Sequence, residues 1–260
     1  MATIELPVNL FKRALAEGRT QIGLWTSLGT GTVAEILSGA GFDWLLIDTE
    51  HSPNEVPMVL DQLRGMEGSG VTPIVRPAWN DPVLFKRLLD LGAQSLLVPM
   101  VQSAEDAERA VAATRYPPDG IRGIAVVHRA NRYGRVKDYH VQANREMCVL
   151  VQLETRRAIA ALEEIAAVEG VDGLFIGPSD LAGDLGYLGN NRHEEAVKVF
   201  AEACARARRA GKPIGILAPV EEDARRYLDM GFSYVAVGSD IGLLRQAAES
   251  IRARFGTKGD

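Results

Sequence analysis

Two carboxylates, Glu154 and Asp180, follow two short apolar runs of this 260-residue chain. The run Cys148–Leu153 is apolar and β-branched enough to form a buried parallel strand, and Gly173–Ile176 is a second such run. Because parallel strands end at the same edge of a sheet, both carboxylates would lie where α/β proteins bind ligands. Oxygen ligands with room for water suit a hard divalent cation, Mg²⁺ or Mn²⁺. The alternative is that both acids only cap the helices that follow.

Further side chains that could do chemistry stand at the ends of the other predicted strands. In chain order they are Trp25, Asp48, Glu50, His51, Arg76, Gln152 and Ser179. His51 could act as a general base whose ring is oriented by Asp48, three residues earlier. Arg76 could stabilise a developing oxyanion, or it could be a structural partner of an acid. The remaining strands end in apolar or small residues such as Leu217, so the pattern predicts a pocket for a small acid.

Eight short strands and the helices between them would have to position these groups. The predicted strands are 21–25, 43–48, 72–76, 95–100, 148–154, 173–176, 213–217 and 234–238. The predicted helices lie at about 9–17, 32–38, 54–66, 82–92, after residue 103, between the fifth and sixth strands, and at 193–210, 220–230 and 241–255. This alternation is typical of an α/β fold, the (β/α)₈ barrel, with a doubly wound open sheet as the alternative. No linker divides the chain, so we expect a single domain, 1–260.

The alternation breaks between residues 116 and 144. This segment is rich in proline, glycine and arginine, shows no sustained periodicity, and is too long for an ordinary connection. We expect an irregular insertion that lies over the active-site face or at a subunit interface.

Composition excludes several other classes of protein. A formal net charge of −5 argues against a dedicated nucleic-acid surface. No apolar run approaches the roughly 20 residues that a membrane span needs, and the N-terminus lacks the basic and apolar regions of a secretory signal. Cys148 and Cys204 fall in a predicted buried strand and on a predicted helix, as free thiols of a reducing compartment do. We therefore expect a cytoplasmic protein without a membrane or nucleic-acid partner.

Six segments carry a family resemblance. They are Ile47–Asn54, Val75–Pro82, Leu97–Gln102, Arg115–Gly123, Gln152–Thr155 and Gly170–Leu181. In content and order they resemble the 4-hydroxy-2-oxoheptanedioate aldolase (HpcH/HpaI) family, and the resemblance extends over nearly the whole chain, from about residue 22 to 256. It implies a class II pyruvate aldolase on a modified TIM barrel, which catalyses reversible aldol cleavage and addition between a 2-oxo acid (pyruvate or hydroxypyruvate) and an aldehyde, as in aromatic compound catabolism. It also implies a homohexamer of paired subunits, with a C-terminal helix that could be exchanged between them.

The same resemblance assigns roles to the catalytic and metal-binding residues. The acids matching Glu154 and Asp180 hold a divalent cation, which could be Mg²⁺, Mn²⁺ or Co²⁺. The arginine matching Arg76 contacts the keto oxygen of the substrate. The histidine matching His51 is the base, and it is paired with the acid matching Asp48.

Other matched positions would bind the substrate. Gln152 matches a residue beside the keto group, and the backbone at Ser179 and Asp180 matches a turn that binds the carboxylate. Trp25 and Leu217 would line the same mouth. The acid matching Asp90 reaches the site from a neighbouring subunit, although on spacing alone Asp90 is most simply a solvated charge. Residues 126–128, Val-Val-His, replace a small-residue stretch of the family, which weakens any inference about the aldehyde.

A Schiff-base mechanism is disfavoured because it needs a lysine in the mouth, and none ends a predicted strand. The six lysines are Lys12, Lys86, Lys137, Lys198, Lys212 and Lys258. Three rival functions stay open. One is an oxidoreductase, since Gly29–Ala34 followed by Asp48 mimics a dinucleotide fingerprint. The second is a lyase for acyl-CoA esters on a related barrel, with the insertion arginines binding the CoA phosphates, and the third is a non-catalytic assembly protein.

Overall fold

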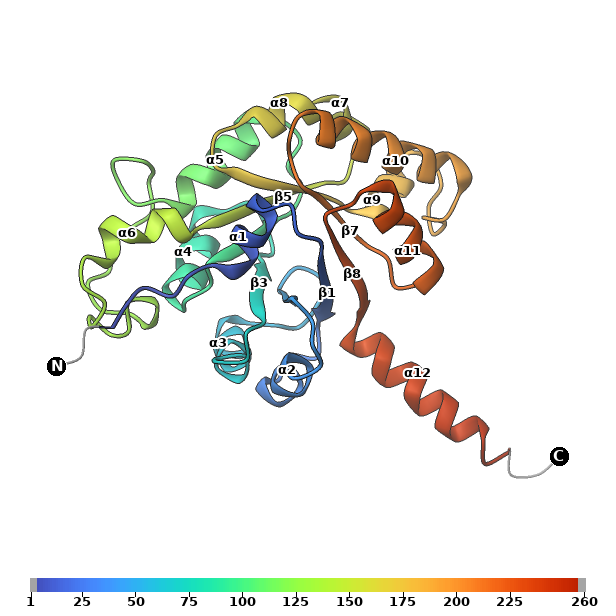
Figure 1. Cartoon of the computed structure of the whole chain (residues 1–260), viewed down its shortest axis with the longest axis horizontal. Coiled ribbons are helices and arrows are strands. Elements are labelled where there is room, and N and C mark those ends of the chain that lie inside the picture. Colours follow the sequence, from blue (N-terminus) through green and yellow to red (C-terminus); the bar gives the residue numbers. More distant parts are fainter. Residues whose placement is uncertain (1–3, 257–260) are drawn as a thin grey trace.

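The computed structural model describes residues 4–256 and forms a closed barrel of eight parallel strands (Figure 1). The strands are β1 (Gln21–Thr26), β2 (Trp44–Asp48), β3 (Thr72–Arg76), β4 (Ser95–Val98), β5 (Cys148–Leu153), β6 (Val171–Ile176), β7 (Ile214–Leu217) and β8 (Tyr234–Ser239). They pair in chain order, and β8 closes onto β1. The predicted barrel is confirmed, although β6 begins two residues earlier and β4 ends two residues earlier than expected. Lys258, predicted to lie in the C-terminal tail, falls outside the described residues.

Helices follow the strands and cover the outside of the barrel. They are α1 (Leu10–Ala16), α2 (Gly31–Ser38), α3 (Val56–Gly65), α4 (Pro82–Asp90), α5 (Ala104–Thr114), α6 (Tyr139–Glu146), α7 (Arg156–Ala160), α8 (Leu162–Ala167), α9 (Pro178–Asp184), α10 (Glu194–Arg209), α11 (Glu221–Met230) and α12 (Asp240–Ala253). A short 3-10 helix spans Arg129–Asn131. Within the described residues, no helix combines the length and the apolar character needed to cross a membrane.

Aromatic side chains close the end of the barrel at which the strands begin. Helix α1 is capped by Asn9, whose side chain accepts a hydrogen bond from the Lys12 backbone N–H. The cap directs Phe11 into the barrel, where its ring centroid lies 6.0 Å from that of Trp44 and 5.5 Å from that of Tyr234. Such edge-to-face contacts add to the burial of apolar area. The interior is therefore sealed on this side, and ligands can enter only where the strands end.

The insertion differs from its prediction in two ways. It contains the helix α6 and a small core of its own, formed by Tyr116, Val136, Tyr139 and Ala143. It also lies at the closed end of the barrel: the α6 residue Glu146 accepts a hydrogen bond from the Asn9 backbone, and its carbonyl accepts one from the Asn9 side chain. The expectation that it covers this chain's own active-site face is therefore wrong, because the chain leaves α5 at the end opposite to that face. Whether it lies at a subunit interface stays a prediction.

Helix α12 leaves the barrel instead of packing along it (Figure 1). Asp240 is its only buried residue, and apolar side chains along it are open to solvent, with Leu244 61% and Ile251 51% exposed. The Asp240 carboxylate accepts hydrogen bonds from the backbone N–H groups of Ser27 and Leu28, which fixes the base of the helix to the segment after β1. An apolar helix face of this kind normally meets a partner, which agrees with the expected exchange between subunits without testing it.

Candidate active site

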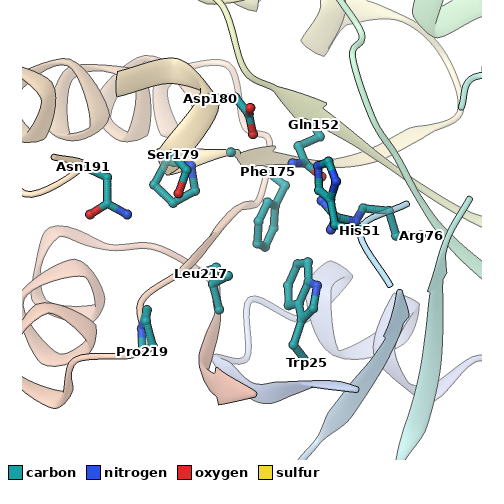
Figure 2. Close-up of a pocket in the computed structure, with 12 residues that line it drawn as sticks. Trp25, His51, Arg76, Gln152, Phe175, Ser179, Asp180, Asn191, Leu217 and Pro219 are labelled. Carbon is teal, nitrogen blue, oxygen red and sulfur yellow. The ribbon is translucent and has the colours of Figure 1, made fainter. Parts of the chain in front are cut away.

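A cavity of about 210 Å³ opens where the strands end (Figure 2). Its lining comprises Trp25, His51, Arg76, Gln152, Phe175, Gly177, Pro178, Ser179, Asp180, Asn191, Leu217 and Pro219. Figure 2 shows His51, Arg76 and Gln152 on one side and Asn191 and Pro219 on the other. Trp25 and Phe175 form the apolar floor, with their ring centroids 5.6 Å apart. The cavity is small enough that it suits a small acid better than a drug-sized ligand.

Arg76 is held by two carboxylates at the end of β3. Its Nε and Nη2 donate to the two oxygens of Asp48, at 2.9 and 2.7 Å, and its Nη1 lies 2.9 Å from Glu50 Oε2. Burial tends to raise the pKa of Asp48, but the hydrogen bonds and the charge of Arg76 outweigh it, so the pKa lies below its ordinary value. Two of the five N–H donors of the guanidinium make these hydrogen bonds, and the contact with Glu50 is an ion pair. Arg76 lines the cavity, so its remaining N–H donors can meet an oxygen there.

The loop after β2 presents His51 to the cavity, but not in the way the sequence predicted. The oxygen Oδ1 of Asp48 accepts from the backbone N–H groups of Glu50 and His51, at 3.0 and 3.4 Å. In residues 4–256 no hydrogen bond joins Asp48 to the His51 ring, which is exposed. The expected pairing of Asp48 with the His51 ring is not formed in the described residues, where Asp48 binds Arg76, and it stays a prediction.

A buried amide holds the start of that loop. Asn54 Nδ2 donates to the backbone carbonyl of Asp48 at 2.7 Å, and Gln62 Nε2 of α3 donates to Asn54 Oδ1 at 3.1 Å. Both amide side chains are almost completely buried. A fully bonded buried network of this kind restricts the loop to one arrangement. The position of His51 thus depends on packing between α3 and β2, which spacing in the sequence does not show.

Glu154 lies one layer below the cavity, directly after β5. Its Oε1 accepts a hydrogen bond from Gln152 Nε2 at 2.5 Å, and its Oε2 accepts one from the backbone N–H of Met100 at 2.8 Å. A Cβ at position 177 would stand 2.8 Å from Glu154 Oε1 and 2.9 Å from Gln152 Nε2. Glycine is therefore required at position 177, because a side chain there would collide with this carboxylate.

Glu154 lies in surroundings that disfavour its negative charge. Burial raises the pKa of Glu154 to about 7 despite the Met100 N–H, and the neighbouring carboxylates of Glu50 and Asp180 add to the rise. Burial likewise raises the pKa of Glu50, against the attraction of Arg76. Acids crowded in this way, with one positive partner nearby, are typical of a site that receives a cation.

A divalent cation fits this donor set. In residues 4–256 no group of three or more His, Cys, Asp or Glu side chains forms a complete metal cage. The two candidate ligands, Glu154 and Asp180, would supply carboxylate oxygens and leave positions for water and substrate, as hard cations prefer. Gln152 Oε1 is also buried without a hydrogen-bond partner.

The remaining predicted site residues divide into two groups. Trp25, Ser179 and Leu217 line the cavity as predicted. Asp90 does not, because it ends α4 near the closed end of the barrel, where it is paired with Arg122 at 2.8 Å. A role for it at a neighbouring subunit's site stays a prediction.

Several residues of the site were not predicted. Glu50 was expected at the end of β2, but its pairing with Arg76 was not. Phe175 precedes the end of β6 and points inward. Asn191 and Pro219 lie in irregular connections, and no sequence signal indicated that these loops reach the cavity.

The contacts disfavour two of the rival functions. In the glycine-rich turn after β1, the Gly31 backbone N–H donates to Asp61 of α3, and the side chain of Asn54 stands where a Cβ of Gly29 would lie. This turn has no open face for a pyrophosphate, and Asp48, the expected ribose ligand, is bound to Arg76. For acyl-CoA esters, the insertion arginines Arg129 and Arg132 are both paired with Glu67. No lysine of residues 4–256 lines the cavity, as the argument against a Schiff base requires.

Known proteins resemble this chain over nearly its whole length. The family profile described as HpcH/HpaI aldolase/citrate lyase matches residues 21–247. The chain is 55% identical over 251 residues to the 4-hydroxy-2-oxo-heptane-1,7-dioate aldolase of Shigella sonnei, covering 96% of each chain, and 54% identical to the pyruvate aldolase of Rhizobium etli, covering 98% of this chain and 100% of that one.

A solved structure extends the likeness to the fold. The crystal structure of an HpcH/HpaI aldolase/citrate lyase family protein from Burkholderia cenocepacia superposes with a TM-score of 0.93 at 39% identity, covering 96% of this chain and 100% of that one. Relatives named as aldolases are lyases by reaction class. The profile, the identities and the shared barrel together show that the chain belongs to the HpcH/HpaI aldolase/citrate lyase family.

Proposed function

We propose that this protein is a divalent-metal-dependent aldolase that adds a 2-oxo acid, pyruvate or hydroxypyruvate, to an aldehyde and cleaves the product in reverse. The observation that carries the proposal is the cavity in which Arg76, held by Asp48 and Glu50, faces the carboxylate Asp180 with Glu154 beneath. The names of the Shigella and Rhizobium relatives support both the reaction and the donor class.

The chain's own groups would divide the work as follows. A divalent cation held by Glu154 and Asp180 would supply Lewis acidity toward the keto oxygen. N–H groups of Arg76 that Asp48 does not use would donate to that oxygen as negative charge develops on it. The backbone at Ser179 and Asp180 would bind the carboxylate of the 2-oxo acid, and Trp25 and Leu217 would exclude water.

His51 would handle the proton of the aldol hydroxyl. Its exposed ring lines the cavity without a protein hydrogen-bond partner in residues 4–256, so it can reach a substrate hydroxyl directly or through water. In cleavage it would take the proton, and in addition it would return it. The carboxylate that orients the ring would come from outside the chain, since Asp48 is bound to Arg76.

We assign that orienting role to Asp90 of a neighbouring subunit in a homo-oligomer, a hexamer of paired subunits. The exposed apolar helix α12 supports assembly, and so do exposed apolar side chains close to Arg122, namely Ile121, Ile124, Val126 and Val127. Asp90 is partly exposed and therefore available to a second copy. The buried free thiols of Cys148 and Cys204 support a reducing, cytoplasmic location.

An activity matrix tests the proposal. The metal-stripped protein would be assayed with pyruvate and hydroxypyruvate against a series of aldehydes, with Mg²⁺, Mn²⁺ or Co²⁺ restored in turn. We expect turnover that depends on the cation with at least one of the two donors. Turnover only with CoA thioesters, or only with a nicotinamide cofactor, would favour a rival function. Oligomer formation with neither Mn²⁺ binding nor turnover would indicate an assembly protein.

Hybrid oligomers test the shared site. Glu154→Gln and Asp90→Asn chains carrying different tags would be co-expressed and purified through both tags. If Asp90 acts on a neighbour, each inactive chain supplies the half that the other lacks, and about a quarter of randomly paired sites should be intact. Activity no higher than that of either parent would show that Asp90 does not act between subunits.

A further inference from the structure

A second buried arginine lies at the opposite end of the barrel, and its surroundings are unlike those of Arg76. The Arg122 side chain has no exposed surface, and its single recorded hydrogen bond runs from Nη2 to Asp90 Oδ1 at 2.8 Å. Its Nε and Nη1 have no hydrogen-bond partner within residues 4–256. The guanidinium carbon instead stands 4.3 Å from the centroid of the Tyr116 ring. The strongest directional interaction of this cation within the described residues is thus the ion pair with Asp90.

Aromatic rings surround this pair. Tyr116 and Tyr139 pack edge to face at 6.3 Å, and His128 packs on Tyr139 at 5.2 Å. Both ring nitrogens of His128 are buried without a partner, and burial lowers the pKa of His128, so the ring adds no charge near neutral pH. None of the cavities described for residues 4–256 is lined by Arg122 or His128. The cluster has no room for a ligand of its own.

Two features of Asp90 are costly in a purely structural pair. It is the last residue of α4, where the negative end of the helix dipole disfavours a carboxylate. Its partner is a fully desolvated guanidinium, and burying such a group costs several kcal/mol that one ion pair barely offsets. The insertion is already attached to α4 by a hydrogen bond from Arg129 Nη1 to the Leu91 carbonyl at 2.6 Å. Attachment of the insertion to α4 therefore does not explain why the Arg122 guanidinium is buried beside Asp90.

We propose that Arg122 is a positioning residue for Asp90: it holds one oxygen of the carboxylate and the aromatic walls prevent it from turning elsewhere. The Asp90 side chain is 24% exposed, so its other oxygen is within reach of a second subunit. This inference rests on the proposed action of Asp90 at a neighbour's site. The rigid ring cluster of the insertion then decides where an acid from one subunit meets His51 of another.

Kinetics of single and double variants give the first test. Arg122→Met should lower kcat by about 10²-fold, as Asp90→Asn does, because an unanchored acid no longer orients the base. Mn²⁺ binding by calorimetry and the oligomer size should stay unchanged. Arg122→Met combined with Asp90→Asn should be no slower than either alone, and Arg122→Lys should recover part of the loss. The matched control is Arg129→Met, which removes a structural contact of the same segment and should leave kcat unchanged.

Hybrid oligomers give the second test. Arg122→Met chains mixed with Glu154→Gln chains should recover activity, whereas mixtures with Asp90→Asn chains should not, because both parents then lack a positioned acid. The reverse pattern would place Arg122 in its own chain's site and overturn the inference, as would a near-normal kcat in Arg122→Met. If Arg122→Met fails to assemble, Arg122→Lys enters the same mixtures. Should Asp90→Asn and Glu154→Gln themselves fail to complement, the shared site is wrong, and that failure is separate from this one.

Discussion

The molecule contains two buried arginine–carboxylate pairs, and they differ in what remains free. The mouth pair, Asp48–Arg76, stands at the open end of the barrel, where Arg76 lines a cavity and keeps N–H donors that Asp48 does not use. The insertion pair, Asp90–Arg122, stands at the closed end, where the arginine is enclosed and the acid is partly exposed. In the mouth pair, Asp48 holds the Arg76 guanidinium in place beside the cavity. In the insertion pair, Arg122 holds the Asp90 carboxylate in place at the surface.

This difference shows how one chain can carry two halves of a site that do not meet within it. The mouth pair stands beside Gln152, Asp180 and the proposed cation site. In the proposed mechanism this site lacks only a group that orients His51. The insertion pair supplies such a group, the Asp90 carboxylate, but this carboxylate lies far from His51 of the same chain. The predictions below test this division, starting with the largest effect.

Removal of a proposed metal ligand should be the most damaging change. Glu154→Gln or Asp180→Asn should lower kcat/KM by at least about 10³-fold, since the carbonyl loses its Lewis acid. Calorimetry with Mn²⁺ should show weakened or absent binding in both, with circular dichroism unchanged. Wild-type Mn²⁺ affinity in either variant would remove that residue from the ligand set, and with it the reason for assigning catalysis to the mouth.

Replacement of the mouth arginine should come next. Arg76→Lys keeps the charge but lacks the fork that meets Asp48 and Glu50 together, so we expect a loss of about 10²-fold in kcat/KM. Mn²⁺ binding should persist, because the ligands remain. A kcat/KM of Arg76→Lys equal to that of the wild type would show that a single positive charge is enough to stabilise the oxyanion. The several N–H donors of the Arg76 guanidinium would then not be needed.

The pH dependence of Mn²⁺ stabilisation should be a moderate effect. Glu154 has a pKa of about 7 in the metal-free fold, against an ordinary value of 4.5. Between these values the folded state holds a proton that the unfolded state releases, so stability should fall as pH rises from 4.5 to 7, by about 3 kcal/mol at most. A cation replaces that proton.

Thermal unfolding checks this expectation. Mn²⁺ should raise Tm more at about pH 8 than at about pH 5.5, where protons compete with the cation for Glu154. The dependence on pH should disappear in Glu154→Gln. An equal shift at both pH values in the wild-type protein would contradict the assignment of the raised pKa to the metal ligand.

The smallest effect is expected for a contact of the insertion that does not touch Asp90. Arg129→Met should lower the free energy of unfolding by about 1 kcal/mol through loss of its bonds to Leu91 and Glu67. Its kcat should stay within about twofold of wild type, since Arg122 is intact. A large loss of kcat here would mean that the whole insertion, and not the pair alone, decides the position of the acid.

Much of the fold could be predicted from the sequence for local reasons. Strands such as Thr72–Arg76 are short, mostly apolar runs bounded by turn residues. Asp81 followed by Pro82 is a local signal for the start of a helix, because proline fits the first helical position. The helix α6 was missed because its pattern is polar and its first residues stand beside aromatic rings of the insertion core. Without that core the segment has no periodic signal.

The site divides in the same way. Periodicity placed Asp48, Arg76, Glu154 and Asp180 at strand ends, and parallel strands bring their ends together, so the sequence by itself determined the composition of the mouth. Only the tertiary structure decided that Asp48 binds Arg76 and not the His51 ring, and that Asp90 points away from its own cavity. The reason is that a carboxylate bonds the nearest donor of the right geometry, and the donors around Asp48 and Asp90 come from strands and loops far away in the chain.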